Sequence, residues 1–337
     1  MITLVWRTDV HLAVQPPQSR TDDWADTVLD KLRQVGEIAR EVKANAVIDG
    51  GDFFHIKTPS RTTHALIQRV AAIHAEYPCP VYGLTGNHDV KYGDPAYVNE
   101  APLGVLFETG VFKRLGGDIE KVFTESESEQ LGNTYQHDTY ETNRVRVVGI
   151  PYHGKAYDPN RLTTIVKGNE KFLVVAAHLL ASPAGGEMFG SEDIVAYGDL
   201  ANLDPDVWMF GHWHKNQGVT KLGQKLIVNI GSLTRGALNE DDVARTPEVA
   251  ILRFDAKEGV TIERRELDVK PAAEVFDLEG RTRQEAKSMT VDAFVESVKE
   301  TLTQQTRKPL LDEVREMDML DPVRERLILY LEEEGAS

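Results

Sequence analysis

Only one cysteine, Cys79, occurs among the 337 residues. An internal disulfide is therefore excluded, and a zinc clamp built on several thiolates is excluded with it. No apolar run approaches the roughly eighteen residues that span a membrane, and Met1 leads into an apolar stretch without a preceding basic segment. Repeats and low-complexity tracts are also missing. We therefore expect a soluble, cytoplasmic globular protein.

Basic residues are scarce as well. Lysine and arginine number 38 against 54 aspartate and glutamate residues, which gives a formal net charge of -16. A protein that wraps nucleic acid by itself normally presents a basic surface. Any contact with DNA must therefore be local, assisted by metal ions, or shared with a partner. The acidic balance also favours solubility.

The first third of the chain alternates between apolar runs and amphipathic stretches. Short apolar runs at residues 2–6, 46–48 and 81–84 predict strands buried on both faces. Between them, residues 22–42 carry apolar side chains every three or four positions, and a second helix is expected after Pro59, with Ser60 as its cap. This alternation predicts a layered α/β domain.

The remainder of the chain is richer in strands until its last sixty residues. Strands are predicted at 122–124, 134–140, 145–150, 172–177, 207–210, 225–230, 249–254 and 260–267. A short helix is expected at 103–108, and the acidic tract 125–129 is expected to be a solvated turn. Apolar stripes at 291–302 and 323–331 predict helices. We divide the chain into a main domain over residues 1–270 and a helical segment over 281–337.

Polar side chains follow five of the predicted strands directly. They are Asp9 and His11, Asp52, Asn87 and His88, His178, and finally His212 and His214. Since open α/β sheets hold their ligands at the carboxyl ends of the strands, these side chains are expected to share one edge. Isolated histidines elsewhere, such as His74 in the second predicted helix, are interpreted as surface or core residues.

Carboxylate, amide and imidazole groups without any thiolate suit manganese, iron or zinc. Seven such groups, leaving His88 aside, are too many for one tetrahedral ion. They suit two ions that share a bridging carboxylate, roughly 3.5 to 4 Å apart, which is the arrangement that clamps a phosphate during displacement. The alternative, unrelated core histidines, would require five strand ends to carry ligand types by chance.

These motifs carry a resemblance. Asp9-x-His11, Gly51-Asp52, Gly86-Asn87-His88-Asp89, His178 and Gly211-His212-x-His214 together resemble the five-motif signature of calcineurin-like metallophosphoesterases. The resemblance implies a four-layer α/β/β/α sandwich. Within that superfamily, the stretch from Gly50 to His55, followed by Thr58-Pro59-Ser60, is similar to the Mre11/SbcD DNA-repair nucleases.

The resemblance also implies a role for each residue. One metal would be held by Asp9, His11, Asp52 and His214, and the other by Asp52, Asn87, His178 and His212, with Asp52 as the bridge. His88 would protonate or stabilise the leaving 3′-oxygen, Asp89 would fix the tautomer of His88, and His55 would position the substrate strand. The implied cofactors are two divalent ions, manganese first, with magnesium, iron and zinc left open.

The function implied is phosphodiester hydrolysis during double-strand-break processing, as a 3′–5′ exonuclease and single-strand endonuclease. A Rad50/SbcC-like ATPase would dock on the apolar stripes at 291–302 and 323–331, unless these pack on the protein's own sheet. A homodimer would form through residues 97–112, and a DNA-capping domain would be reduced to part of 263–280 or absent. Two alternatives stay open: a small-molecule phosphodiesterase or phosphatase, and, ranked last because no ligand position is eroded, a non-catalytic scaffold.

Overall fold

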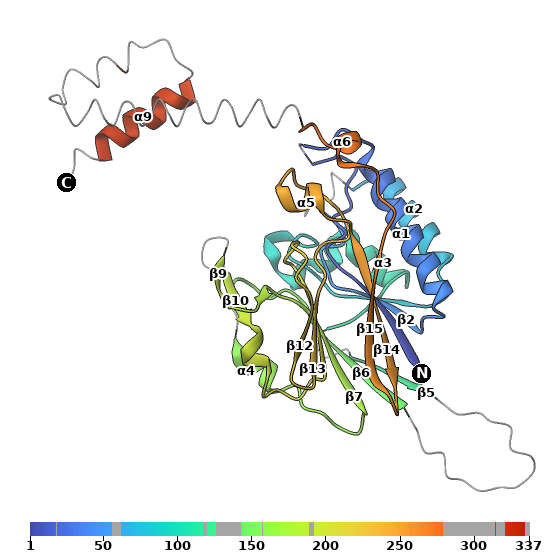
Figure 1. Ribbon diagram of the computed structural model, residues 1–337. Helices are drawn as coiled ribbons and strands as arrows, with labels where there is room; N and C mark the ends of the chain where they lie inside the picture. The colour runs from blue at the N-terminus through green and yellow to red at the C-terminus, as the bar shows by residue number, and fades with distance from the viewer. Residues whose placement is uncertain are drawn as a thin grey trace, which may run out of the picture. The chain divides into compact units, whose positions relative to one another are not determined.

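The structure, a computed structural model, describes residues 1–278 except Gln18, 56–61, 117–119, 126–142, Tyr157 and 189–191, together with Val314 and 321–333. The chain divides into two compact units, Met1–Phe276 and Asp277–Ser337 (Figure 1). In the second unit, α9 (Asp321–Glu333) confirms the helix predicted at 323–331. The stripe predicted at 291–302 lies outside the described residues. No helix among those described is both long and apolar enough to cross a bilayer.

Two six-stranded sheets form the first unit. The first sheet, in the order β15-β14-β1-β2-β3-β4, consists of β15 (Gly259–Glu266), β14 (Glu248–Asp255), β1 (Ile2–Arg7), β2 (Ala46–Asp49), β3 (Val81–Gly83) and β4 (Lys113–Arg114). The second, in the order β12-β13-β11-β7-β6-β5, consists of β12 (Gly218–Leu222), β13 (Lys225–Asn229), β11 (Val207–Gly211), β7 (Phe172–His178), β6 (Asn143–Ile150) and β5 (Glu120–Glu125). A small third sheet contains β8 (Ala181–Ser182), β10 (Glu192–Ala196) and β9 (Gly186–Met188).

The helices of the first unit are short apart from two. They are α1 (Trp24–Glu41), α2 (His64–Ala75), α3 (Pro102–Glu108), α4 (Pro159–Thr163), α5 (Glu240–Ala244) and α6 (Ala272–Val275), with single turns η2 (Lys91–Gly93), η3 (Pro95–Glu100) and η4 (Tyr197–Leu200). Asp23 caps α1 by accepting a hydrogen bond from the backbone N–H of Asp26. The predicted cap of the second helix was wrong: α2 begins at His64, and the Thr63 hydroxyl accepts from Leu66 N. Ser60 lies outside the described residues.

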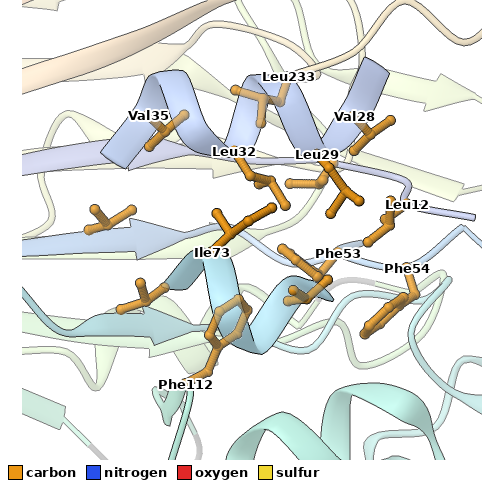
Figure 2. Packing of buried hydrophobic residues seen from close by; sticks show 14 of the residues in the cluster. Leu12, Val28, Leu29, Leu32, Val35, Phe53, Phe54, Ile73, Phe112 and Leu233 are labelled. Carbon is orange, nitrogen blue, oxygen red and sulfur yellow. The ribbon is translucent and has the colours of Figure 1, made fainter. Parts of the chain in front are cut away.

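Three apolar clusters give the molecule its layers. Helices α1, α2 and α3 pack on the outer face of the first sheet, where Val28, Leu32 and Val35 of α1 meet Phe53 and other buried side chains (Figure 2). The inner faces of the two sheets form a second cluster, and the third covers the outer face of the second sheet. This confirms the predicted four-layer α/β/β/α sandwich.

Strands β14 and β15 belong to the first sheet, although the sequence order groups them with the second set of strands. β14 runs antiparallel to β1, with Ile2 opposite Phe254 and Trp6 opposite Ala250. The apolar patterns of these strands predict burial but do not specify which sheet they join. A reduced cap was expected within residues 263–280. In the structure, residues 263–266 are the end of β15 and residues 272–275 form the single turn of α6, with a connecting segment between them.

The loops that follow β1 and β2 continue to pair beyond the strands. The backbone N–H of His11 donates to the Asp52 carbonyl over 2.9 Å, and Leu12 N–H donates to the Phe53 carbonyl over 2.9 Å. Leu12, Phe53 and Phe54 are fully buried beneath α1 (Figure 2). The core therefore fixes the two loops that carry Asp9, His11 and Asp52.

A buried polar network supports the same strands from the side. Arg7 forms an ion pair of 2.7 Å with Asp49, and its other nitrogens lie 2.9 Å from the Tyr77 hydroxyl and 3.0 Å from Nε2 of His74. Nδ1 of His74 donates to the Val70 carbonyl, since a carbonyl can only accept. His74 is thus a core histidine, as the sequence suggests. Burial lowers the pKa of His74 well below 6.5, and the charge of Arg7 lowers it further.

Acid should therefore destabilise the fold through His74. Below pH 6.5 the unfolded chain binds a proton at this position that the folded chain rejects, so stability falls by about 1.4 kcal/mol per pH unit from this group. Urea unfolding at several pH values between 7.5 and 5 should show a smaller loss in His74→Gln than in the wild type. His64→Gln, an exposed histidine on the same helix, is the matched control. Equal pH slopes in both variants would contradict this role.

Candidate metal centre

Four of the predicted ligands meet where β1, β2 and β11 end. Donor atoms of Asp9, His11, Asp52 and His214 all lie within 4.8 Å of one another. Nε2 of His11 is 2.8 Å from Nε2 of His214, and each of these nitrogens is 3.8 to 3.9 Å from Oδ1 of Asp9. Asp9 and Asp52 are completely buried and His11 is nearly so, whereas His214 is open to solvent.

The other predicted ligands gather on the opposite side of Asp52. Donor atoms of Asp52, His178 and His212 lie within 4.8 Å of one another. Nε2 of His178 is 3.4 Å from Oδ2 of Asp52 and 3.3 Å from the side-chain oxygen of Asn87. Asp52 is therefore common to both groups. All seven residues predicted from the strand ends share one site.

His88 and His55 lie beside the first group. Their rings stack with centroids 5.5 Å apart and planes 10° apart, and both are close to the ring of His11. Nδ1 of His88 lies 3.0 Å from the backbone carbonyl oxygen of His55. Because the carbonyl can only accept, it fixes Nδ1 as the protonated nitrogen and leaves Nε2 for chemistry.

The predicted role of Asp89 was wrong. Its two carboxylate oxygens accept hydrogen bonds of 2.9 Å from the backbone N–H groups of Phe54 and Gly86, and His88 is not among its partners. Asp89 joins the motif loop to the loop after β2, and the His55 carbonyl orients His88 instead. Burial raises the pKa of Asp89 well above 3.8, and the nearby Asp52 carboxylate raises it further.

The backbone at this site is strained. Asp9, His11, Asp52 and His212 all have positive φ angles, between 50° and 85°, a region that side chains other than glycine rarely adopt. Gly86 allows its backbone to lie against the Asp52 side chain, since a Cβ atom at this position would be only 2.1 Å from Oδ1 of Asp52. Strain of this kind persists only where the surrounding structure holds it, and it is typical of functional sites.

Backbone groups orient the predicted ligands. Oδ1 of Asp52 accepts a 2.7 Å hydrogen bond from His88 N–H, and both oxygens of Asp9 accept from His212 N–H. Nδ1 of His178 lies 2.7 Å from the Gly50 carbonyl oxygen and must donate to it. Nε2 of His178 is thereby directed at Asp52, as a metal-binding imidazole requires.

Two residues at this site were not predicted from the sequence. Oε1 of Glu192, a buried residue of β10, is 2.9 Å from Nε2 of His212, which leaves Nδ1 as the ring nitrogen with a free lone pair. Tyr152 hydrogen-bonds the same carboxylate, and its pKa is raised to about 12 by burial and by Glu192, so the phenol stays a donor. For Glu192, the only sequence signal was an acid two residues before the apolar Ile194 and Val195.

The residues fit a pair of divalent cations. Oδ2 of Asp52 is buried and has no hydrogen-bond partner, although it faces His11 at 3.8 Å and His178 at 3.4 Å. Donors about 2.1 Å from a shared ion are separated by roughly 3 to 3.5 Å, close to the distances found here. Burial alone would raise the pKa of Asp52, but His178 and His11 hold it well below 3.8. Conversely, burial disfavours protonated His178, yet Asp52 raises its pKa to about 9. Asp52 and His178 together thus hold a proton at neutral pH, which shows that this position favours a positive charge.

A cleft of about 930 Å³ opens over the centre. Asp52, Asn87, His88, His212 and His214 form its floor. Trp213 and Lys215 line one part of its wall, and the acidic helix α5, with Glu240 and Asp241, lines another. The volume far exceeds that of a single phosphate group.

Comparison with known proteins gives one match in sequence. Residues 3–216 match the family model described as calcineurin-like phosphoesterase. A comparison with curated protein sequences finds no match. Similar solved structures include a dimetal phosphatase from Danio rerio, with 11% identity and a TM-score of 0.49 over 79% of this chain and 96% of that one. An archaeal phosphodiesterase has 13% identity and a TM-score of 0.37 over 79% and 100%. The purple acid phosphatase PPD1 of yellow lupin, Lupinus luteus, has 15% identity and a TM-score of 0.42 over 79% and 51%.

Glu192 should strengthen cation binding through His212. Replacing Glu192 with alanine removes the acceptor that orients the imidazole, and we expect the affinity for one of two manganese ions to fall by about 10- to 100-fold. Glu192→Gln, which keeps an acceptor oxygen, should lose less. Isothermal titration calorimetry measures both sites. Asp199→Ala removes an exposed carboxylate of the neighbouring η4 and serves as the charge-matched control. Equal affinities in the two alanine variants would contradict the assignment.

Proposed function

The chain belongs to the calcineurin-like phosphoesterase family, and from that premise we propose that it is a two-metal DNA nuclease of the Mre11/SbcD type. The observation that supports this finer proposal is the placement of His55. This residue, part of the Gly50 to His55 stretch that resembles those nucleases, stacks on His88 and orients it through its carbonyl. A histidine pair at the rim of the metal centre suits a substrate that continues beyond the reacting phosphate.

The proposed metal sites follow the two donor groups. One ion is assigned to Asp9, His11, Asp52 and His214, and the other to Asp52, Asn87, His178 and His212. Imidazole, carboxylate and amide donors suit manganese, which we propose as the activating metal. When bound, the two ions supply positive charge against the phosphate oxygens and make water a stronger nucleophile at neutral pH.

His88 assists the departure of the leaving group. Its Nδ1–H is held by the His55 carbonyl, so a second proton can reside only on Nε2. The imidazolium then donates this proton to the departing 3′-oxygen, while the backbone N–H of His88 keeps Oδ1 of Asp52 in place. One residue thus connects proton transfer to the position of the shared carboxylate.

A second candidate function has its own supporting observation. Glu240 and Asp241 of α5 line the cleft, and Lys215 is the only lysine or arginine among its lining residues within the described chain. Acids at this position repel a polyanion more than a small diester. A small-molecule phosphodiesterase or phosphatase is therefore the alternative that this wall favours.

Two partners are proposed as well. A Rad50/SbcC-like ATPase would bind the second unit, in which the sequence of α9 has five consecutive apolar or aromatic residues, 327–331, between charged ones. A homodimer would form around residues 97–112, where Val105 of α3 is 45% exposed and the 86% exposed Tyr92 contacts the ring of Tyr97. Exposed apolar side chains at one place favour association with another protein.

The division of labour between His88 and Asp52 can be measured. His88→Ala should keep both ions and lose about 10²- to 10⁴-fold in turnover, because it removes only the proton donor. Asp52→Asn should lose metal, because it removes the shared charge. Metal analysis of the purified variants, followed by single-turnover kinetics, distinguishes the two outcomes. Equal metal depletion would overturn the assignment.

The substrate class can be tested with three substrates in the presence of manganese. Linear duplex DNA, circular single-stranded DNA and a chromogenic phosphodiester should all be hydrolysed by a nuclease of this type. Turnover of the chromogenic diester alone would support the small-molecule alternative. No turnover of any substrate by a metal-loaded protein would leave only the scaffold interpretation.

The docking role of the second unit predicts a separable loss. Deleting residues 290–337 should abolish co-purification of an ATPase subunit and leave hydrolysis of the chromogenic diester at the wild-type rate. Circular dichroism of the truncated protein checks that the first unit stays folded. An unfolded product would show instead that these residues complete the core.

A further inference from the structure

A second cleft, separate from the one over the metal centre, lies beside the start of α1. It has a volume of about 810 Å³ and is lined by α1, the loop at Thr234 and Arg235, and residues 268–275. Its cationic side chains are Arg20, Lys31, Arg33, Arg69, Arg235 and Lys270. Four aspartates also line it, which leaves a surplus of two positive charges in a chain with a net charge of -16. We refer to it as the Arg235 cleft.

Arg235 has two acids near it, Asp242 and Asp22, but no ion-pair partner among the described residues. Its side chain is 7% exposed and donates to the carbonyl of Lys270, while its guanidinium lies 5.9 Å from the ring of Phe276. No carboxylate of the described residues forms an ion pair with it, whereas Arg20 is paired with Asp22 at 2.7 Å. Burial lowers the pKa of Arg235, and the charges of Arg20 and Arg245 lower it further.

Lys31 is also nearly buried, but it has an acidic partner. It is 5% exposed, donates to the carbonyl of Asp268, and lies 3.5 Å from a carboxylate oxygen of Asp30. Burial lowers the pKa of Lys31. The Lys270 carbonyl that accepts from Arg235 carries no net charge, whereas Asp30 compensates Lys31. A role in holding residues 268–276 in place therefore does not by itself explain why these cations lie together.

Two further cations lie at the rim of the cleft. Arg33 on α1 and Lys270 are exposed, and neither forms an ion pair with any described residue. They supply the exposed cations of this cleft, in which Arg235 is nearly buried. Such cations suit phosphate groups, which guanidinium and ammonium side chains bind by charge-assisted hydrogen bonds.

The Arg235 cleft adjoins the metal centre. Ala237 lines the cleft over the metals and Arg235 lines the other, so their backbones are separated by at most about 7 Å. The Trp24 indole, in the wall of the Arg235 cleft, donates to the backbone carbonyl of His11 over 3.2 Å. The Thr234 hydroxyl donates to the Val10 carbonyl over 3.3 Å.

We propose that the Arg235 cleft binds backbone phosphates of the nucleic-acid strand whose reacting phosphate lies at the metal centre. This inference rests on the proposed nuclease function and supplies what that function lacks, a local positive surface on an acidic protein. The strand leaves the metal centre past Ala237 and Gly236 and reaches Arg235 within a few nucleotides. Arg33 and Lys270 then contact phosphates farther along.

The test compares two substrates with single-charge variants of the full-length protein. KM and kcat are measured with manganese for a single-stranded oligonucleotide and for bis(4-nitrophenyl) phosphate, which is too small to span both clefts. In Arg33→Gln, Lys270→Gln and Arg235→Gln, the ratio of oligonucleotide KM to diester KM should rise on the order of three- to tenfold. Each substitution should also weaken the salt dependence of the oligonucleotide KM by about 0.7 in its logarithmic slope, because it removes one cation from the phosphates.

Arg40→Gln is the matched control, because it removes one charge from an exposed position of the same helix outside the cleft. Its KM ratio should stay at the wild-type value. Thermal unfolding checks Arg235→Gln, and the two exposed rim variants keep the test valid where that protein fails to fold. A ratio in the rim variants equal to that of Arg40→Gln overturns the proposal.

Failure of the proposed function gives a different result. A wild-type protein that hydrolyses the diester and leaves the oligonucleotide intact contradicts both the nuclease and the strand path. Oligonucleotide cleavage that is insensitive to the cleft variants contradicts the strand path alone. A third result is that inorganic phosphate binds the wild type but not Lys270→Gln, while the two proteins have the same oligonucleotide KM. This result would assign the cleft to a free anion, and it would overturn the strand path as well.

Discussion

The site depends on one carboxylate oxygen, Oδ2 of Asp52. It is buried, lacks a hydrogen-bond partner and lies between His11 and His178, so the folded chain keeps a negative charge where only a cation can compensate it. Burying this charge costs several kcal/mol, which protonated His178 offsets in part. The positive φ angles of Asp9, His11 and Asp52 add to this cost. The fold tolerates these costs because the two loops are fixed by their own core residues.

Those loops behave as extensions of the sheet. Parallel pairing continues past β1 and β2 up to the bridge between Leu12 and Phe54, and both of these side chains are fully buried. Asp89 closes the arrangement from the third loop, because its oxygens hold the backbone of Phe54 and of Gly86. The carboxylate that sequence reasoning assigned to the chemistry of His88 therefore positions backbone instead.

The sequence predicted the strand ends well and the side-chain partners poorly, for a physical reason. A buried strand followed by a polar residue is a local pattern, and the sheet edge brings such residues together whatever the loops do in detail. The partner of His88 is a backbone carbonyl, and the partner of His212 is Glu192 from a small separate sheet. Neither of these two partners can be found from the spacing of residues in the sequence. The assignment of β14 and β15 to the first sheet escaped prediction for the same reason, since strand pairing is not local.

The distribution of charge around the two clefts bears on which substrate this centre takes. Glu240 and Asp241 repel phosphate at one wall of the metal cleft, whereas Arg235, Arg33 and Lys270 attract it a few residues away. At physiological salt such fields are screened over about 8 Å, so each acts only on the part of a substrate near it. A small diester at the candidate metal centre meets these acids and, among lysines and arginines of the described lining, only Lys215. A strand on the proposed path would gain attraction in the Arg235 cleft that offsets them. The proposed path would therefore select for length, because the acidic wall weakens the binding of short substrates and the neighbouring cations favour only chains that extend beyond the centre.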